Sequence, residues 1–471
     1  MYQTPEENFY RLHHIRPRFK DNVENVLFFM ANKLNQMNTM PSLDFKRAFN
    51  DEIRLFPGNS LKKEKTINNW RTEISALFGF VVEEEGYTSP GSRAIELAEK
   101  PDLIEFFKIF LYNFQYPGAH LKSREVVKMV TEGIKFKPAH YILRLLKDVE
   151  QVPYKERYIS KAEVCHMIFN DLRCTRDFDT TENVWVRILY NRRHNIRYDW
   201  TGDVIRYAGD ILDYMDLANL LNTYNGYDFW INKNEEVAIQ NFIKGDDDFK
   251  GYDSYISSRS ISIAEANEQA APWFAYVNRD MSQSNFSTDV LALISENEQQ
   301  YDEMRQHALS LFELKLQNGD ITTKEIGDLG ESLAHEHECN RILKAGRKDL
   351  IHLIQLIPTQ FSVGYDLQSI ETNEQKRLIE VKSTVSSKPL MFNSFHLTPN
   401  EWRSAESFKD RYFVYRLMLS KGEMKLFVIQ DPVGKYKSNV LSMIPKKNGA
   451  DISFNDKTAG KYEELLLNEG V

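Results

Sequence analysis

The sequence predicts a multi-domain α+β protein with a mainly helical, winged-helix-like N-terminal region and a C-terminal α/β domain built on a mixed sheet. The chain has 471 residues, which is enough for several domains. Apolar residues at helical spacing dominate the first half and are interrupted by short extended pairs. From about residue 320, strand-like apolar runs alternate with helices, a mixture typical of a small α/β domain.

Composition narrows the class of protein. Apolar residues make up 42% and aromatic residues 12%, which suits ordinary globular cores. The net charge of −8 gives no support for nucleic-acid binding. It does not exclude such binding either, because contact with nucleic acid depends on local basic patches. Three scattered cysteines cannot form a disulfide framework or a four-ligand zinc site. The sequence lacks a signal peptide and an apolar run of roughly 18 residues, so we expect a soluble cytoplasmic protein with no membrane partner.

The N-terminal region divides into two expected subdomains. VENVLFFMANKLNQM and KTINNWRTEISALFGFVV show helical periodicity, and VVEEEGYTSPGSRAIELAE holds two extended pieces around a turn. This order predicts a winged-helix-like subdomain over residues 1–115. Residues 116–243 repeat the rhythm with short amphipathic helices, and we interpret GYDFWINKNEEVAI as the strand pair of a further wing. They form a second, helical and winged-helix-like region.

Residues 244–319 are expected to connect the two halves. Residues 244–285 break the helical pattern. KGDDDFKGYDSYISSRS, at their start, is polar and rich in turn formers, which predicts a linker or extended loop. A long polar helix with a spaced apolar stripe is expected over 287–319.

The C-terminal domain is expected over residues 320–471. GDLGESLAHEHECNRILKAG predicts a helix, and LTPNEWRSAESF predicts another, with Thr398 as N-cap and Pro399 in its first turn. Four apolar runs predict strands: LIHLIQLI, RLIEVKST, RYFVYRLML and MKLFVIQDP.

One predicted hairpin, VGYDLQSIETNEQKRLIEVKST (363–384), carries charges in an apolar setting. Glu380 and Lys382 are two residues apart in the sequence, so their side chains point to the same face of the strand. Asp366 precedes them by enough residues for a turn, so its carboxylate can lie beside Glu380. Two close carboxylates repel unless a cation separates them, and such oxygen-rich sites suit Mg²⁺. Taken alone, a Glu and a Lys two apart are more often a solvated strand face.

The surrounding motifs supply a resemblance. GYD followed by IEVKST resembles the PD-(D/E)XK nuclease motif, with Tyr365 where that family often has proline. More narrowly, GDLGE, VGYDLQSI, IEVKST and LTPNEWRSAESF resemble, in this order, the NO VEIN C-terminal-type nuclease domain of bacterial restriction and defence proteins, over about residues 320–435. The resemblance implies that Asp366 and Glu380 hold Mg²⁺ with help from Glu331. It also implies that Lys382 positions the attacking water, so that all four residues are catalytic.

Two basic segments are candidates for contact with double-stranded DNA, although solvated helix faces explain such charge equally well. Asn and Arg can read base edges, and Lys can hold phosphates. The first segment contains Lys62, Lys63, Lys65, Asn68, Asn69 and Arg71, and the second contains Arg187, Arg192, Arg193 and Arg197 among aromatic residues.

These observations lead to the expectation of a bacterial, Mg²⁺-dependent, type II restriction endonuclease. Separate recognition and cleavage regions resemble the type IIS arrangement. One catalytic site per chain then requires a homodimer, a second subunit or sequential nicking to cut both strands. Two alternatives stay open. One is a structure- or repair-directed nuclease without sequence preference. The other is a non-enzymatic winged-helix regulator with an inactive nuclease-like domain.

Overall fold

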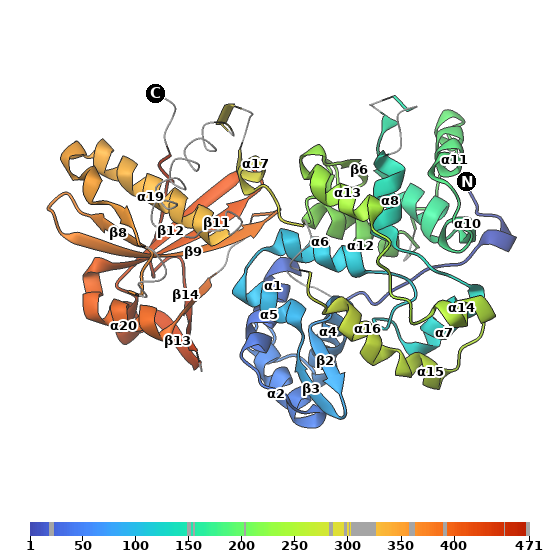
Figure 1. Ribbon diagram of the computed structural model, residues 1–471, viewed down its shortest axis with the longest axis horizontal. Coiled ribbons are helices and arrows are strands. Elements are labelled where there is room, and N and C mark those ends of the chain that lie inside the picture. Colours follow the sequence, from blue (N-terminus) through green and yellow to red (C-terminus); the bar gives the residue numbers. More distant parts are fainter. Residues whose placement is uncertain are drawn as a thin grey trace. The chain divides into compact units, whose positions relative to one another are not determined.

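The protein divides into two compact units, unit 1 (Met1–Thr288) and unit 2 (Asp289–Val471) (Figure 1). Helices dominate unit 1, and a mixed sheet organises unit 2, which confirms the predicted α+β class. In the described residues, no helix is long and apolar enough to cross a membrane. The computed structural model describes residues 1–17, 23–147, 152–153, 156–201, 204–281, 286–295, 299–300, 302, 326–357, 363–389, 393–446 and 448–467.

Unit 1 begins with a small helical module that carries a three-stranded antiparallel sheet of order β1-β3-β2. The predicted extended pair is confirmed as the β2–β3 hairpin. A π-helical turn, Trp70–Ile74, joins α3 to α4. The elements in chain order are α1 (Val23–Asn35), β1 (Met40–Pro41), α2 (Ser42–Arg54), α3 (Glu64–Asn69), α4 (Ser75–Phe78), β2 (Val81–Glu84), β3 (Tyr87–Pro90), α5 (Ser92–Glu99) and α6 (Leu103–Asn113).

The rest of unit 1 is mainly helical and contains a second small sheet of order β4-β6-β5. Its elements are α7 (Ser123–Glu132), α8 (Pro138–Lys147), β4 (Ile159–Ser160), α9 (Lys161–Val164), a π-helical turn (Cys165–Phe169), α10 (Leu172–Thr175), α11 (Thr181–Arg193), α12 (Val204–Leu217), β5 (Leu221–Asn222), β6 (Asp228–Ile231), α13 (Glu236–Lys244), α14 (Asp253–Ser258), α15 (Ile263–Glu268) and α16 (Ala270–Val277).

Two local predictions in this region are wrong. Only β6 is extended within GYDFWINKNEEVAI, and the remainder enters helix α13, because Ala238, Ile239 and Phe242 bury one helical face. Residues 253–277 form α14–α16 where a linker or loop was expected. Buried Tyr252 and Trp273 attach this polar stretch to unit 1, so tertiary packing decides its structure.

The predicted long helix over 287–319 lies mostly outside the described residues. Helix α17 (Val290–Ile294) lies there, and the described residues 299, 300 and 302 are helical as well. The amide of Gly422 donates to the carbonyl of Leu293 (3.2 Å).

Unit 2 is built on a six-stranded mixed sheet of order β15-β12-β11-β9-β8-β7. Strands β9 and β11 run parallel, and the other neighbours are antiparallel. Much of LIHLIQLI is a 3₁₀ helix (Lys348–Leu353) rather than a strand. The strands of this sheet are β7 (Gln355–Leu356), β8 (Leu367–Ile370), β9 (Lys376–Ser386), β11 (Tyr412–Ser420), β12 (Glu423–Gln430) and β15 (Lys461–Glu463).

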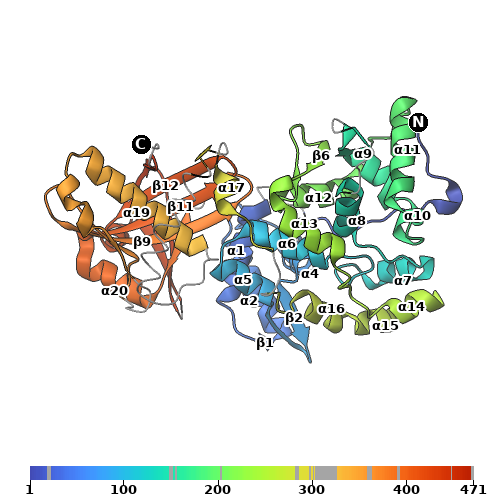
Figure 2. The same ribbon diagram turned by 45° about the horizontal axis from the view of Figure 1, so that its top comes forward.

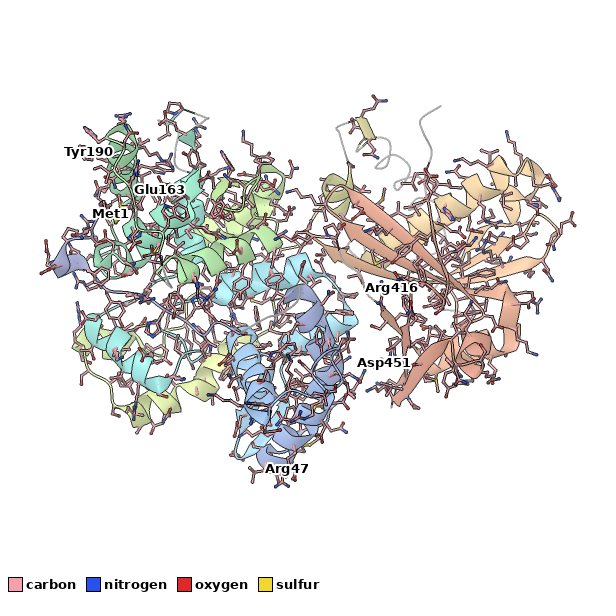
Figure 3. All side chains as sticks on the ribbon, turned by 180° about the vertical axis from the view of Figure 1, so that it is seen from behind. Met1, Arg47, Glu163, Tyr190, Arg416 and Asp451 are labelled. Carbon is pink, nitrogen blue, oxygen red and sulfur yellow. The ribbon has the colours of Figure 1, made fainter. Side chains whose placement is uncertain are left out.

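The two faces of the large sheet have different coverings. Helix α19 (Ile326–Lys344) lies on one side and α20 (Pro399–Phe408) on the other, as Figure 2 shows. On the α20 side lie α21 (Pro432–Lys437) and a second sheet of order β10-β14-β13, with strands β10 (Ser394–Leu397), β13 (Leu441–Lys446) and β14 (Gly449–Phe454). Arg416 belongs to the large sheet and Asp451 to the small one (Figure 3).

Successive side chains of β9 point alternately to the α19 face and to the α20 face of the sheet. A Cβ on Gly330 would lie 1.8 Å from Ser383 Oγ, so only glycine allows α19 to approach β9 this closely. Leu378 packs in the core with Leu397 and Ala405 on the opposite face. Because Glu380 and Lys382 alternate with Ser383, they lie on the α20 face.

A buried polar network fixes α19 to the sheet. Glu338 is fully buried and accepts hydrogen bonds from Tyr415 Oη (2.6 Å) and Ser369 Oγ (2.6 Å). Arg341 adds two bonds to the same carboxylate, at 2.9 and 2.7 Å. Buried charge of this kind is tolerated only when it is paired and hydrogen-bonded.

Candidate active site

A tight turn before β8 positions Asp366. Gly364 has φ +78°, and a Cβ there would lie 2.8 Å from the Asn400 carbonyl oxygen on α20. Tyr412 Oη donates to the Gly364 carbonyl (2.8 Å), and Ser404 Oγ donates to the Val363 carbonyl (2.7 Å). The glycine of the GYD motif therefore lets the turn lie directly against α20.

The Asp366 carboxylate lies beside β9. Its backbone amide donates to the Ile379 carbonyl (2.9 Å), and its Oδ2 accepts from the Val381 amide (2.8 Å). Val381 stands between Glu380 and Lys382 in the strand, so the hairpin brings the three predicted side chains to one place.

Glu380 and Lys382 form a close ion pair on the α20 face. Lys382 Nζ lies 2.6 Å from Glu380 Oε1, and Glu380 is only 3% exposed. The same ammonium lies 3.0 Å from Glu401 Oε2. Lys382 is thus held between a carboxylate of its own strand and one of helix α20.

Sequence reasoning missed Glu401. The predicted Thr398 N-cap is confirmed, and Glu401 completes a capping box, because Glu401 Oε2 accepts from the Thr398 amide (3.0 Å). That local pattern marks Glu401 as a helix-capping residue. Only the crossover from β9 to α20 shows that its carboxylate also meets Lys382.

The charges at this site shift one another's pKa values. Burial raises the pKa of Glu380 well above its usual range, and the carboxylates of Asp366 and Glu401 add to the rise. Burial alone would lower the pKa of Lys382, but Glu380 and Glu401 outweigh it and raise that pKa. For Glu401, burial acts upward, while Lys382 and the Thr398 amide bring the net pKa down. The ammonium therefore stays charged, and negative charge is in excess.

The residues fit a divalent cation by charge and by donor type. Within the described part of the chain, no three His, Cys, Asp or Glu side chains converge as a metal cluster. Mg²⁺ usually needs only one or two carboxylates, because it keeps several waters. Three carboxylates, those of Asp366, Glu380 and Glu401, meet one ammonium here. Burial and this crowding of carboxylates raise the pKa of Glu380, and a divalent cation would relieve the crowding. Asp366 and Glu380 are the residues that would hold the ion.

The assignment of Glu331 stays a prediction. It follows Gly330 on α19, which packs on the opposite face of β9 from Glu380.

His396 stands near Lys382 and has an acceptor at each ring nitrogen. His396 Nδ1 lies 2.9 Å from Asp451 Oδ1, and its Nε2 lies 3.1 Å from the Asn448 carbonyl oxygen. Both ring nitrogens face acceptors, which only the protonated imidazole satisfies together. The hydrogen bond to Asp451 raises the pKa of His396, although burial and the charge of Lys382 oppose the rise.

The first predicted DNA-contact segment is split between exposed and internally bonded residues. Lys63, Lys65 and Asn69 are exposed on or before α3, and Lys62 is half-buried. Arg71 Nη1 instead donates to Asn50 Oδ1 (2.6 Å) and Asn68 Oδ1 (2.8 Å).

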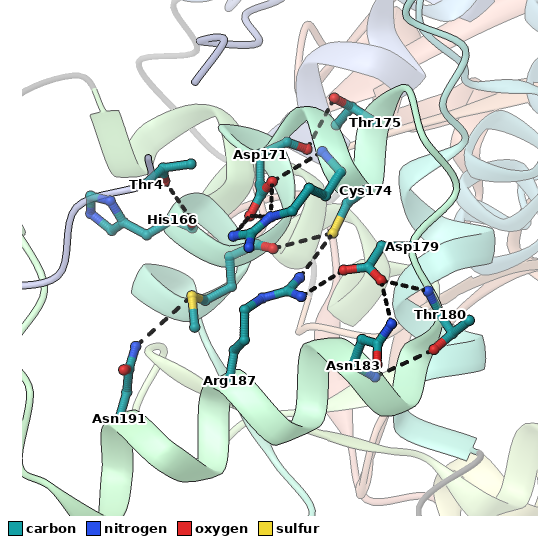
Figure 4. Close-up of polar contacts among 12 residues, drawn as sticks. Thr4, His166, Asp171, Cys174, Thr175, Asp179, Thr180, Asn183, Arg187 and Asn191 are labelled. Carbon is teal, nitrogen blue, oxygen red and sulfur yellow. Dashed lines mark hydrogen bonds and ion pairs between the residues drawn. The ribbon is translucent and has the colours of Figure 1, made fainter. Parts of the chain in front are cut away.

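The second segment is divided in the same way. Arg187 Nη1 donates to Asp179 Oδ2 (2.6 Å), as Figure 4 shows. Arg192 bonds Glu163 at 2.7 and 2.8 Å. Arg193 and Arg197 are exposed. DNA contact stays a prediction for all ten residues. Among them, Asn68, Arg71, Arg187 and Arg192 have internal partners.

Two family models match the chain, each within one unit. Residues 2–274 match the model described as restriction endonuclease BpuJI, N-terminal, and residues 330–429 match the model described as protein NO VEIN, C-terminal. The second match confirms the resemblance seen in GDLGE, VGYDLQSI and IEVKST. No curated protein matches the chain.

A solved structure shares the fold of the N-terminal part. It is described as pyrene- and phenanthrene-modified DNA in complex with the BpuJ1 endonuclease binding domain. The match has 23% sequence identity and a TM-score of 0.50, and it covers 59% of this chain and 100% of that chain.

Proposed function

We propose that this chain, which belongs to the family of the restriction endonuclease BpuJI N-terminal region, is a Mg²⁺-dependent, sequence-specific DNA endonuclease of the restriction type. Unit 1 would select the DNA, and unit 2 would cut it. This separation supports a type IIS arrangement, in which cleavage falls outside the recognised sequence. Cutting both strands would use a homodimer, a second subunit or sequential nicking.

The observation that carries the proposal is the meeting of Asp366, Glu380 and Lys382 on one face of the unit 2 sheet. Asp366 bonds the backbone between the other two, and Lys382 pairs with Glu380. A solvated strand face would leave these side chains exposed, whereas Glu380 is almost fully buried. The mixed sheet with α19 on one face supports a PD-(D/E)XK nuclease domain.

The assignment of unit 1 to DNA recognition rests on several supports. The solved structure that shares its fold is a DNA complex. The element order α1, β1, α2, α3–α4, β2, β3 supports a winged-helix-like subdomain. In such modules a helix enters the major groove. The exposed Lys63, Lys65 and Asn69 lie at α3, where they would meet phosphates and base edges.

Each residue at the site has a role in phosphodiester hydrolysis. A bound Mg²⁺ would polarise the scissile phosphate and acidify a water. Asp366 and Glu380 would hold the ion. The Lys382 ammonium would orient the attacking water and stabilise negative charge that develops on the phosphate. Buried carboxylates keep bulk water from competing for these positions.

Plasmid digestion tests the proposal. The full-length protein should produce discrete fragments with Mg²⁺ and none with EDTA. Asp366→Asn and Lys382→Met should abolish cleavage and leave DNA binding intact. Lys376→Met is the matched control, because Lys376 lies on the same strand but is exposed and contacts Gln368 (3.2 Å).

The alternatives give different results. A smear of fragments would indicate a nuclease without sequence preference. DNA binding with no Mg²⁺-dependent cleavage would indicate a non-enzymatic regulator and would refute the proposal.

A further inference from the structure

Lys382 has two carboxylate partners that come from different elements. Glu380 lies on β9 with Lys382, whereas Glu401 lies in the first turn of α20. The Nζ–oxygen distances are 2.6 Å to Glu380 and 3.0 Å to Glu401. Such charge-assisted hydrogen bonds are about twice as strong as neutral ones.

The Glu401 carboxylate is fixed independently of Lys382. Its Oε2 accepts from the Thr398 amide (3.0 Å), and its own amide donates to Thr398 Oγ1 (3.3 Å). This capping box holds the carboxylate at the start of α20 whether or not the ammonium is present. Glu401 is therefore a fixed acceptor, facing a lysine with a flexible side chain.

The Lys382–Glu380 pair competes with a cation at Glu380. An ammonium 2.6 Å from Oε1 occupies a direction that a metal ion would need. Mg²⁺ binds oxygen at about 2.0–2.1 Å, so both cations cannot share that oxygen position. A cation that binds Glu380 through Oε1 must therefore displace the ammonium from that oxygen.

We propose that Glu401 is a positioning residue that retains Lys382 at the site when a divalent cation takes its place at Glu380. Lys382 then moves from two carboxylates to Glu401 alone and stays next to the cation. The inference rests on the proposed cation site and adds a role for a residue outside the Asp366, Glu380 and Lys382 set.

The proposal predicts an energetic coupling between Glu401 and Lys382 in cation binding. In wild type the displaced ammonium goes from two carboxylates to one, whereas without the Glu401 charge it goes from one carboxylate to none. Because two carboxylates share one ammonium, losing the last partner costs more than losing one of two, so the cation binds more weakly. Without the Lys382 ammonium there is nothing to retain, and loss of Glu401 removes only its general attraction for the cation. Glu401→Gln should therefore weaken binding about tenfold more in the wild-type background than in Lys382→Met, which is a coupling of about 1.4 kcal/mol.

The test is a double-mutant cycle on Mn²⁺ affinity, measured by calorimetry on the full-length chain without DNA. It compares wild type, Glu401→Gln, Lys382→Met and the double variant. Glutamine also satisfies a capping box, so α20 should keep its start, and circular dichroism checks this. Glu406→Gln is the matched control, since this residue lies on the same helix and pairs with Lys437 (3.2 Å).

The outcomes separate the inference from the proposed function. Coupling of about tenfold, with no effect of Glu406→Gln, supports the role of Glu401. An equal loss from Glu401→Gln in both backgrounds would make Glu401 a direct ligand or a simple charge, and would overturn the inference while the site stands. Mn²⁺ binding that is absent, or that survives Asp366→Asn, would overturn the proposed site and the inference together.

Discussion

Replacing Gly364 by alanine tests how the turn before Asp366 is built. Gly364 has φ +78°, and an added Cβ would lie 2.6 Å from Ser404 Oγ and 2.8 Å from the Asn400 carbonyl oxygen. The left-handed conformation costs an L-residue about 1–2 kcal/mol. Overpacking against a helix backbone adds about 1–3 kcal/mol. We therefore expect Gly364→Ala to destabilise unit 2 by about 2–5 kcal/mol, taking the two costs together.

Gly346→Ala is the matched control for this experiment. Gly346 has φ +77°, nearly the same as Gly364, but a Cβ there meets nothing within 4 Å. Its substitution should cost only the conformational part, about 1–2 kcal/mol. The difference between the two variants isolates the packing of the turn against α20.

Hydrogen–deuterium exchange of peptides from β9 and β11 in the full-length chain measures both losses. These strands are buried in unit 2, so their slowest amides report its opening free energy. Equal losses for Gly364→Ala and Gly346→Ala would refute the close approach of the turn to α20. A larger loss for Gly364→Ala, together with weaker Mn²⁺ binding, would support the placement of Asp366 by this turn.

Three further predictions concern charged residues. Burial alone would raise the pKa of Glu338, but Arg377 and Arg341 outweigh it and lower the pKa to about 2 from the ordinary 4.5. The contribution of Glu338 to the free energy of unfolding is therefore complete above pH 4.5 and is lost as the pH falls toward 2. Glu338→Gln should remove this part of the pH dependence of the unfolding free energy. An unchanged pH dependence would contradict the prediction. Lys108→Met should destabilise unit 1 by about 3–5 kcal/mol in thermal unfolding, because fully buried Lys108 pairs with Glu235 at 2.6 Å. Lys128→Met is the control, since Lys128 is exposed. Equal effects of the two substitutions would argue against the buried pair. Lys65→Ala should reduce the slope of log DNA affinity against log salt concentration by about 1, as expected for one phosphate contact. Arg192→Ala should instead lower the stability of unit 1. Fluorescence anisotropy on a short duplex measures the slope, and an unchanged slope for Lys65→Ala would exclude that contact.

Local patterns were sufficient for several parts of the fold. The β8–β9 hairpin follows from alternating apolar residues, and the Thr398 cap with Pro399 follows from helix-start chemistry. The glycines of the GDLGE and GYD motifs can be recognised in the sequence, but the need for glycine there comes from tertiary contacts. Gly330 packs against Ser383, and Gly364 packs against α20. These predictions succeeded because the signals are short-range and the structure does not override them.

Other parts needed contacts between distant residues. Polar residues 253–277 fold as helices because Tyr252 and Trp273 join the core of unit 1. The guanidinium of Arg192 is bonded to Glu163, which no periodicity reveals. A basic residue in a sequence has the same appearance whether its partner is a phosphate or an internal carboxylate.

By itself, the sequence determined that Asp366, Glu380 and Lys382 belong to one hairpin, because strand alternation and turn length leave them on one face. It also determined that Thr398, three residues before Glu401, caps the helix that follows. Only the tertiary structure decided that Glu401 and Lys382 share a hydrogen bond (3.0 Å), since the chain crosses from β9 to α20 between them. Burial in the core between the sheet and α20 then turns four ordinary charges into a site with an excess of negative charge.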